Sequence, residues 1–206
     1  MITDLTTLLA AVKRWARRDN LEDDAYLEFI QMAEVHLNSR LRVRRMTKWF
    51  DSETIAGVFF YSQPEDASGL RNIEIHSGKQ RFPLEFYSPE AMDADFGWSS
   101  QGGRPVAYTL SGNGFELQPC PNAAYPIRII YYQRIPSLTA ANPTNWLLSA
   151  YPDTYLYGSL MALAEYVRDD EVAGLWAPKF AQALERIIAA DSEDRWSGST
   201  PAMKAL

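Results

Sequence analysis

The segment NPTNWLLSAYPDTYLYGSLMALAEY, residues 142–166, contains one tryptophan and four tyrosines but no histidine, cysteine or basic residue. Asp153 and Glu165 are its only charged side chains. Pro152 suits the first turn of a helix, where its missing N–H costs no hydrogen bond. Apolar residues then recur at helical spacing, at Leu156, Leu160, Leu163, Ala164 and Val167. The segment therefore predicts a helix over 152–168 that offers contact area and little catalytic chemistry.

Three further amphipathic helices are predicted, over residues 4–18, 23–41 and 171–191. Each has apolar residues at the i, i+3, i+4, i+7 spacing of one helix face. The first two stripes contain Leu5, Leu8, Leu9, Val12, Trp15 and Ala16, and then Tyr26, Phe29, Ile30, Ala33, Leu37 and Leu41. The last contains Trp176, Phe180, Ala183, Leu184, Ile187 and Ile188. Pro178 lies inside this last pattern and predicts a kink or a later start.

The chain between residues 54 and 136 is typical of a β module. Residues 76–79 and 111–114 are predicted hairpin loops, each between two strand-like runs, and the second loop reads SGNG. PIRIIYYQ, residues 126–133, predicts a half-buried strand, GVFFYS at 57–62 a weaker one, and residues 89–95 a short helix. Neither terminal helix pair can close a core alone, so the two pairs must meet in space. The order of two helices, several strands and two helices predicts an α+β fold. Its N- and C-terminal helix pairs form one bundle around an inserted antiparallel β module.

Composition excludes several classes of function. The net charge is -6, which disfavours wrapping around nucleic acid. Cys120 is the single cysteine, so no internal disulfide is expected, and with only His36 and His76 there is no metal-ligand spacing. No nucleotide-binding or catalytic motif is present, so we expect no cofactor and no enzymatic activity. The N-terminal residues lack the pattern of a signal peptide, and no membrane span is predicted.

The one strong charge cluster is RLRVRRMTK, residues 40–48, with Arg40, Arg42, Arg44, Arg45 and Lys48. Such a cluster suits either DNA phosphates or the acidic residues of a neighbouring subunit. Residues 1–50 contain nine basic and seven acidic side chains, so the local charge is only +2. This small excess favours a subunit contact over DNA binding.

Two motifs resemble the head-to-tail adaptor family of tailed bacteriophages: FIQMAEVHLNSRLRVRRM at 29–46 and YYQRIPSLTAANPTNWLLSAYPDTYLYGSLMALAEYVRDDE at 131–171. WSGS at 196–199 also matches, whereas residues 47–70 and Pro178 depart from the pattern. The resemblance implies a structural protein of the virion neck, assembled in the host cytoplasm. It implies a ring, commonly of about twelve copies, that links the portal of the capsid to a downstream tail or nozzle protein. Genome DNA would pass through the ring without specific binding.

The resemblance also suggests roles for particular residues. Aromatic side chains give large contact areas with few rotatable bonds. We therefore expect a subunit interface at Trp146, Tyr151, Tyr155 and Tyr157, together with Arg40, Arg42, Arg44 and Arg45. The alternative is that these aromatic residues cap the junction between bundle and β module. Residues 195–206 are expected to form an extended arm that contacts the portal through Arg195, Trp196, Met203 and Leu206.

Two other functions stay open from the sequence. A tail-associated peptidoglycan hydrolase would require two carboxylates across a cleft, yet the acidic clusters at 22–24 and 169–171 lie where helix starts favour acids. An assembly factor absent from the mature particle would have a similar composition. Mass spectrometry of purified virions separates this last function from that of a neck protein.

Overall fold

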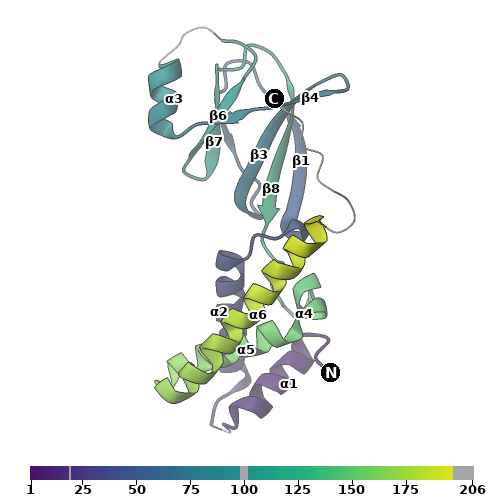
Figure 1. The fold of residues 1–206 in the computed structure, drawn as a ribbon, viewed down its shortest axis with the longest axis vertical. Helices are drawn as coiled ribbons and strands as arrows, with labels where there is room; N and C mark the ends of the chain where they lie inside the picture. Colours follow the sequence, from purple (N-terminus) through teal and green to yellow (C-terminus); the bar gives the residue numbers. More distant parts are fainter. Residues whose placement is uncertain (19, 98–101, 197–206) are drawn as a thin grey trace. The chain divides into compact units, whose positions relative to one another are not determined.

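A computed structural model describes residues 1–18, 20–97 and 102–196 (Figure 1). The chain divides into two compact units. The helical unit contains residues 1–44 and the chain from 135 onward, and the β unit contains residues 45–134. The two ends of the chain therefore build one bundle around an inserted module, which confirms the predicted α+β fold.

Five helices make up the described part of the helical unit. They are α1 (Leu5–Ala16), α2 (Asp23–Arg40), α4 (Trp146–Ala150), α5 (Pro152–Tyr166) and α6 (Asp170–Trp196). Asp4 begins α1 with a capping box, in which its carboxylate accepts from Thr7 N and the Thr7 hydroxyl accepts from Asp4 N. Asn145 caps α4, where its Oδ1 accepts from Leu148 N at 2.8 Å. Local polar side chains thus set the helix starts.

Helix α5 is the centre of the bundle, since it packs against α1, α2 and α6 (Figure 1). Every residue from Thr154 to Ala164 except Tyr157 is buried, so the helix is covered on nearly all sides. Gly158 allows this close packing. A Cβ atom at Gly158 would lie 2.9 Å from Ala33 Cβ of α2 and 3.0 Å from Phe180 Cε2 of α6. The absent side chain lets two helices approach α5 at the same level.

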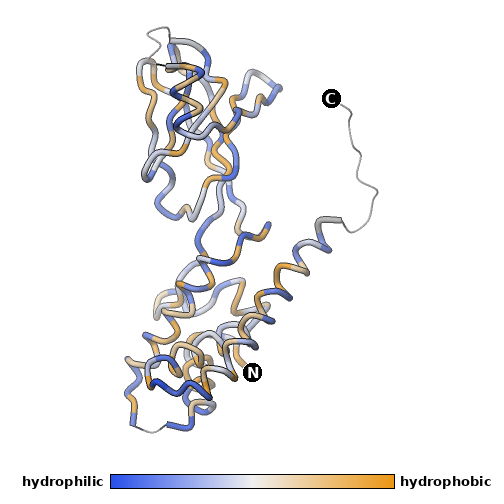
Figure 2. Tube along the Cα trace, turned by 60° about the vertical axis from the view of Figure 1, so that its left-hand side comes forward, coloured by the Kyte–Doolittle hydropathy of each residue, from blue (hydrophilic) through white to orange (hydrophobic). Residues whose placement is uncertain are grey.

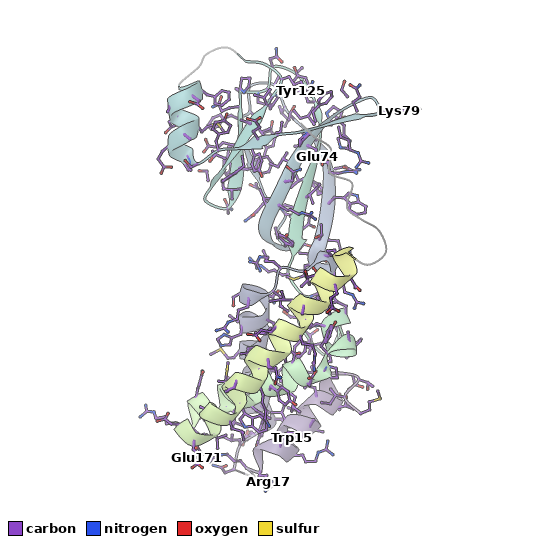
Figure 3. All side chains as sticks on the ribbon, in the orientation of Figure 1. Trp15, Arg17, Glu74, Lys79, Tyr125 and Glu171 are labelled. Atoms are coloured by element: carbon purple, nitrogen blue, oxygen red, sulfur yellow. The ribbon has the colours of Figure 1, made fainter. Side chains whose placement is uncertain are left out.

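The predicted apolar stripes mostly form the core of the bundle. All six stripe residues of α2 are buried, and α6 buries Trp176, Phe180, Ala183, Leu184 and Ile187. Figure 2 shows the corresponding alternation of apolar and polar residues along α6. Trp15 and Ile188 depart from the prediction, since both are about half exposed. Figure 3 labels Trp15 on α1.

The β unit is a two-sheet sandwich. One sheet has the order β1 (Thr47–Glu53), β8 (Pro126–Gln133), β3 (Ala67–Ser77), β4 (Gln80–Pro83). The other has the order β2 (Phe60–Ser62), β7 (Gly114–Gln118), β6 (Ala107–Ser111), β5 (Glu85–Phe86). The shared core is formed by Ile73, Ile75, Leu84, Tyr108, Phe115, Leu117, Ile127 and Ile129. A short helix, α3 (Pro89–Phe96), and a 3-10 turn, η1 (Arg44–Met46), complete the described elements.

Both predicted hairpins are present with tighter turns than expected. β3 extends to Ser77 and β4 begins at Gln80, so His76 lies within a strand and only Gly78 and Lys79 form the turn. Ser111 pairs directly with Gly114 at the end of β6–β7. Gly78 and Gly112 have φ angles of 60° and 55°, a backbone region that glycine adopts without strain.

Three features of the fold differ from the prediction. Strand β1 lies before the expected start of the module at residue 54. It was not predicted, because TKWFDSE lacks a clean alternation of apolar and polar residues. β5 pairs with β6 in parallel, so the module is not purely antiparallel. α6 runs through Pro178 and continues to Trp196, beyond the expected end at 191. Gly198 and Pro201 are the first strong helix breakers after this point in the sequence.

The contacts of Gly158 predict a sharp difference between two glycine substitutions. Gly158→Ala is expected to lower the free energy of unfolding by about 1–3 kcal/mol, because the new methyl group overpacks the contact with Ala33 and Phe180. Gly174→Ala is the matched control, because a Cβ there meets nothing within 4 Å in helix α6. Gly174→Ala should raise the free energy of unfolding by up to about 1 kcal/mol. Urea unfolding followed by circular dichroism measures both, and equal effects would contradict the packing role of Gly158.

Candidate functional site

One side of the helical unit carries an aromatic cluster with cations beside it, here named the α6 face. Trp176 lies between Trp15 and Tyr157, with ring centroids 5.7 Å and 5.9 Å away. Lys179 Nζ lies 4.8 Å from the Trp176 ring centroid, within the range of a cation–π contact. The cluster joins α1, α5 and α6, and its outer rings form part of the surface of the unit.

A hollow of about 540 Å³ lies on the same face, between α5 and α6. Its lining includes Tyr157, Lys179, Gln182 and Arg186. Arg186 Nη2 donates to Asp153 Oδ2 at 2.6 Å, and its guanidinium lies 5.9 Å from the Tyr151 ring. The lining also includes Glu185, so the face combines aromatic area with two cations and two acids, and Lys179 is the cation without a carboxylate partner among the described residues.

A second surface, the α2/α5 groove, is apolar with an acidic rim. Its volume is about 470 Å³, and its lining includes Phe29, Met32, Val35, Ala162 and Tyr166. Met32, Val35 and Tyr166 are 56%, 64% and 65% exposed, large fractions for apolar side chains. Glu28 and Glu165 line the groove and are exposed. Neither has an ion-pair partner among the residues that the structure describes.

The segment 135–145, here named the connector, is attached to α2 by buried polar groups. Ile135 N donates to Asn38 Oδ1, and Leu138 N donates to Glu34 Oε1, each at 2.7 Å. Glu34 is buried, and this burial raises the pKa of its carboxyl above the ordinary value of 4.5. Two hydrogen bonds from successive turns of α2 thus fix the path of the chain as it enters the C-terminal half of the bundle.

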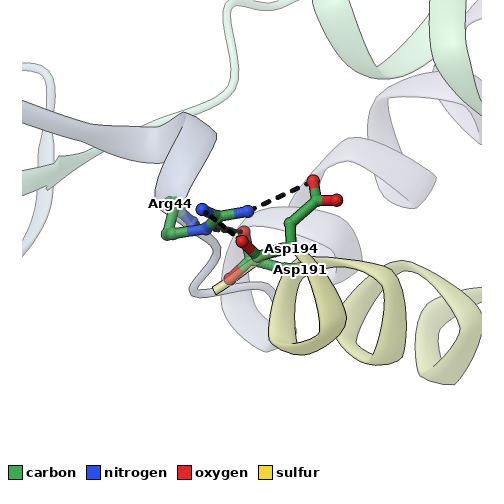
Figure 4. A network of polar contacts seen from close by, with 3 residues as sticks. All are labelled: Arg44, Asp191 and Asp194. Carbon is green, nitrogen blue, oxygen red and sulfur yellow. Dashed lines mark hydrogen bonds and ion pairs between the residues drawn. The ribbon is translucent and has the colours of Figure 1, made fainter. Parts of the chain in front are cut away.

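The end of α6 is attached by Arg44, which follows α2 (Figure 4). Arg44 N and Nε donate to Asp191 Oδ1 at 3.0 Å and 3.2 Å. Arg44 Nη1 donates to Asp194 O at 3.3 Å, and Nη2 lies 3.2 Å from Asp194 Oδ2. One arginine therefore holds the last turns of α6, immediately before the C-terminal segment.

The aromatic residues expected at a subunit interface have different environments. Tyr155 is fully buried, and its hydroxyl accepts from Asn145 Nδ2 at 2.7 Å. Its burial also raises the pKa of the phenol well above its usual range. Tyr155 therefore belongs to the core of the bundle, which corrects its placement at a surface. Its hydroxyl contacts Asn145 at the end of the connector, so the ring lies inside the bundle.

The other three aromatic residues are half-buried. Trp146 begins α4, because Asn145 starts a helical turn there. Tyr151 ends α4 and precedes α5. Tyr151 and Tyr157 both contribute to the α6 face, whereas Trp146 does not line its hollow.

The basic cluster is divided between the two units. Arg40, Arg42 and Arg44 are exposed residues of the helical unit, whereas Arg45 and Lys48 are exposed residues of the β unit. Arg42 Nη1 donates to the carbonyls of Asn38 and Leu41, at 2.8 Å and 2.7 Å, and so caps the end of α2. Arg44 pairs with acids of its own chain, so at least two of the arginines have contacts within the subunit.

The expected portal arm lies mostly outside the described residues. Met203 and Leu206 belong to 197–206, which the structure does not describe. The backbone of Arg195 and Trp196 is helical, as the last residues of α6, so an extended arm cannot begin at 195. The pairing of Arg44 with Asp191 and Asp194 accounts for this extension, because it holds the turns that the sequence leaves without an apolar stripe.

Several surface residues were missed or misplaced by the sequence reasoning. Trp15 was assigned to a buried stripe, but it lies at the rim of the α6 face. Met32, Val35 and Tyr166 were not identified as a group, although their positions off the buried stripes were a usable signal. Trp49 and Phe50 are exposed on the edge strand β1, which was not predicted.

No group of three or more metal-ligating side chains occurs among the described residues. His76 Nε2 lies 3.7 Å from Glu74 Oε2, whereas the His36 ring contacts the Phe180 ring. The two histidines therefore have separate surroundings. Within the described ranges, none of the helices has the length and apolar content required to cross a bilayer.

The comparison with protein families gives one clear result. The family described as SU10 adaptor protein matches residues 3–203. The chain therefore belongs to this family of bacteriophage adaptor proteins, in agreement with the resemblance seen in its motifs. A search of curated proteins gives no match.

The buried Glu34 carboxyl makes a testable contribution to stability. At pH 7, Glu34→Gln should leave the free energy of unfolding unchanged or raise it, because the amide oxygen still accepts from Leu138 and no charge is buried. Glu34→Ala should lower it by about 1–3 kcal/mol, because the Leu138 N–H loses its acceptor.

The sign of the pH dependence follows from the raised pKa. The folded protein holds the Glu34 proton at pH values where the unfolded chain releases it, so stability falls as pH rises between 4.5 and the folded pKa. Glu34→Gln should remove this part of the pH dependence. Unfolding titrations from pH 4 to 8, an interval set by the ordinary carboxyl pKa, measure the difference, and identical profiles would contradict a raised pKa.

Arg44 is predicted to control local opening at the end of α6. Asp191→Ala should speed amide exchange in the last turns of α6 roughly fivefold to tenfold, equivalent to ~1 kcal/mol, with little change in global unfolding. Glu193→Ala is the control, since Glu193 is exposed on the same helix and has no bond to Arg44. Hydrogen exchange with mass spectrometry reports both, and equal exchange in the two variants would rule out the attachment.

Proposed function

We propose that this protein forms a ring between the portal of the capsid and the tail of the virion, and thereby lines part of the channel for the genome. Membership of a phage adaptor family over residues 3–203 is the observation that carries this proposal. Such a role needs no catalytic centre, and it needs at least two kinds of interface: one with copies of the same chain and one with other neck proteins.

The helical unit has surfaces suited to contacts between copies. A ring is built from heterologous interfaces, so each subunit must present two different patches. The α6 face is aromatic with charges of both signs, and the α2/α5 groove is apolar and acidic, so the two surfaces are unlike. Tyr151 and Tyr157 would take part through the α6 face, with Arg40 and Arg42 as further exposed contacts and Trp146 at the edge of the unit.

The portal contact is proposed for the C-terminal segment. Arg44 holds the last described turns of α6, directly before this segment in the sequence. Trp196, Met203 and Leu206 are the apolar anchors in that part of the sequence, and Arg195 would pair with a portal acid. An arm of this kind, repeated around a ring, gains affinity through multivalency.

The channel is proposed to repel the genome weakly. A net charge of -6 per subunit, multiplied around a ring, creates a negative potential that discourages phosphate binding. Free subunits are expected to be mainly monomeric and to assemble on the portal, and the assembled ring would in turn bind the next tail protein.

The portal arm is tested by truncation that respects the helix boundary. Deletion of 197–206 should leave the helical circular dichroism and the Arg44 attachment intact, yet reduce binding to portal rings at least tenfold, because the anchors Met203 and Leu206 are lost. Cosedimentation with portal-bearing heads measures the binding, and Lys79→Ala at the exposed β3–β4 turn is a control. Normal joining of heads by the truncated protein would move the portal contact to the helical bundle.

A further inference from the structure

Within the proposed ring, we infer that the α6 face of one copy docks into the α2/α5 groove of the next copy. The inference rests on the proposed function and adds the pair of surfaces that would meet. It commits to one occupant for the groove, a second copy of this chain. Three observations support it: the placement of the two surfaces around α5, their charges, and the residue spacing along α6.

The two surfaces lie on opposite sides of α5. Tyr157 belongs to the α6 face and Tyr166 to the groove, and they are nine residues apart on one helix. Asp153 and Ala162 show the same separation between the same two surfaces. Nine residues are about two and a half helical turns, which places side chains on opposite faces. A subunit with patches on opposite sides can join neighbours on both sides at once.

This placement suits a ring of many subunits. In a closed ring of n copies, each copy is rotated from the next by one nth of a full turn. The two patches of one subunit therefore point in directions that differ from opposite by this rotation angle. That rotation is about 30° for about twelve copies. Patches on opposite sides of a central helix are therefore compatible with a large ring, whereas a dimer or trimer requires patches that are much closer in direction.

The charges of the two surfaces are complementary. The groove has Glu28 and Glu165 at its lining, and the opposite surface has Lys179 beside Glu185 and an internal ion pair of Arg186 with Asp153. Lys179 has no ion pair with any carboxylate in the described part of the chain, and its cation–π contact with Trp176 leaves it available to a neighbour's acid. The pairing of Lys179 with the acids of the groove would fix the register of docking and disfavour contact between two grooves.

The apolar parts of the two surfaces also match. Leu175, Lys179, Gln182 and Arg186 follow the i, i+4, i+7, i+11 spacing, so they form one outward stripe on α6. Leu175 is 50% exposed and stands at one end of this stripe. In the docked pair, Leu175 would enter the groove between Met32, Val35 and Tyr166, and Lys179 would lie beside Glu165. Burial of these exposed apolar side chains would supply the driving force for association.

Charge exchange between the two surfaces tests the inference in full-length protein. Glu28→Lys with Glu165→Lys reverses the charge of the groove, and Lys179→Glu replaces the unpaired cation of the α6 face by an acid. Each variant alone should form rings on portal at least tenfold less efficiently than the unaltered chain. An equimolar mixture should assemble, because every contact in a ring of alternating variants joins surfaces of opposite charge. Light scattering and electron microscopy of portal complexes measure ring formation.

Matched controls apply the same charge changes to exposed positions of the β unit, Glu65→Lys and Lys79→Glu. These variants should assemble normally. Normal assembly of the groove and face variants would overturn the inference. Failure of the mixture would also overturn it, since both surfaces would then matter without binding each other. Absence of rings with the unaltered chain would instead contradict the proposed function itself.

A second measurement avoids any charge change. In a Cys120→Ser background, Leu175→Cys and Tyr166→Cys place thiols on the two surfaces at exposed positions. A short bifunctional maleimide should link them between copies and give a ladder of covalent oligomers when portal is present. Leu175→Cys without Tyr166→Cys should give no ladder. Equal labelling without linkage in the paired variant would place the two surfaces apart and refute the docking.

Discussion

The close packing of α5 at Gly158 is the constraint on which the helical unit depends. At this position α2 and α6 approach the same helix so closely that a single methyl group would meet both of them. Because α2 comes from the N-terminal half and α6 from the C-terminal half, one glycine joins segments far apart in the sequence. The unit is therefore one bundle made from two ends of the chain, and both surfaces described on it take their positions from α5.

Hydrogen bonds and ion pairs of a few polar side chains hold the segments that apolar packing does not fix. Glu34 and Asn38 hold the connector, and Arg44 holds the end of α6. Glu34 and Asn38 accept from backbone N–H groups of the connector, so they fix the path of the chain where no regular helix or strand does so. A buried carboxylate such as Glu34 is costly to ionise, and its retention fits a need for a defined chain path more than a need for maximal stability.

The sequence was sufficient for the fold class and for most helices, because helical periodicity and capping residues are local signals. The stripe of α2 and the two hairpin turns are examples. Strand β1 and the parallel pair of β5 with β6 could not be predicted, because pairing partners depend on long-range contacts that TKWFDSE does not encode. Which aromatic side chains lie on the surface was harder to predict than the helices and strands. Tyr155 and Tyr157 are two residues apart in a row of similar aromatics, yet one is in the core and one is on the surface. The contacts that distinguish them come from distant parts of the chain: Asn145 covers Tyr155, and Trp176 of α6 stacks on Tyr157.

The attachment of the β unit has a consequence for how such a chain can change over evolution. Thr47 pairs with Tyr132 on neighbouring antiparallel strands, so the places where the chain enters and leaves this unit are only about 5 Å apart. An inserted module whose ends are adjacent can be exchanged for another, or shortened to a few linking residues, without stretching the bundle that holds it. The helical unit can thus stay unchanged while a different module is inserted at the same two adjacent points.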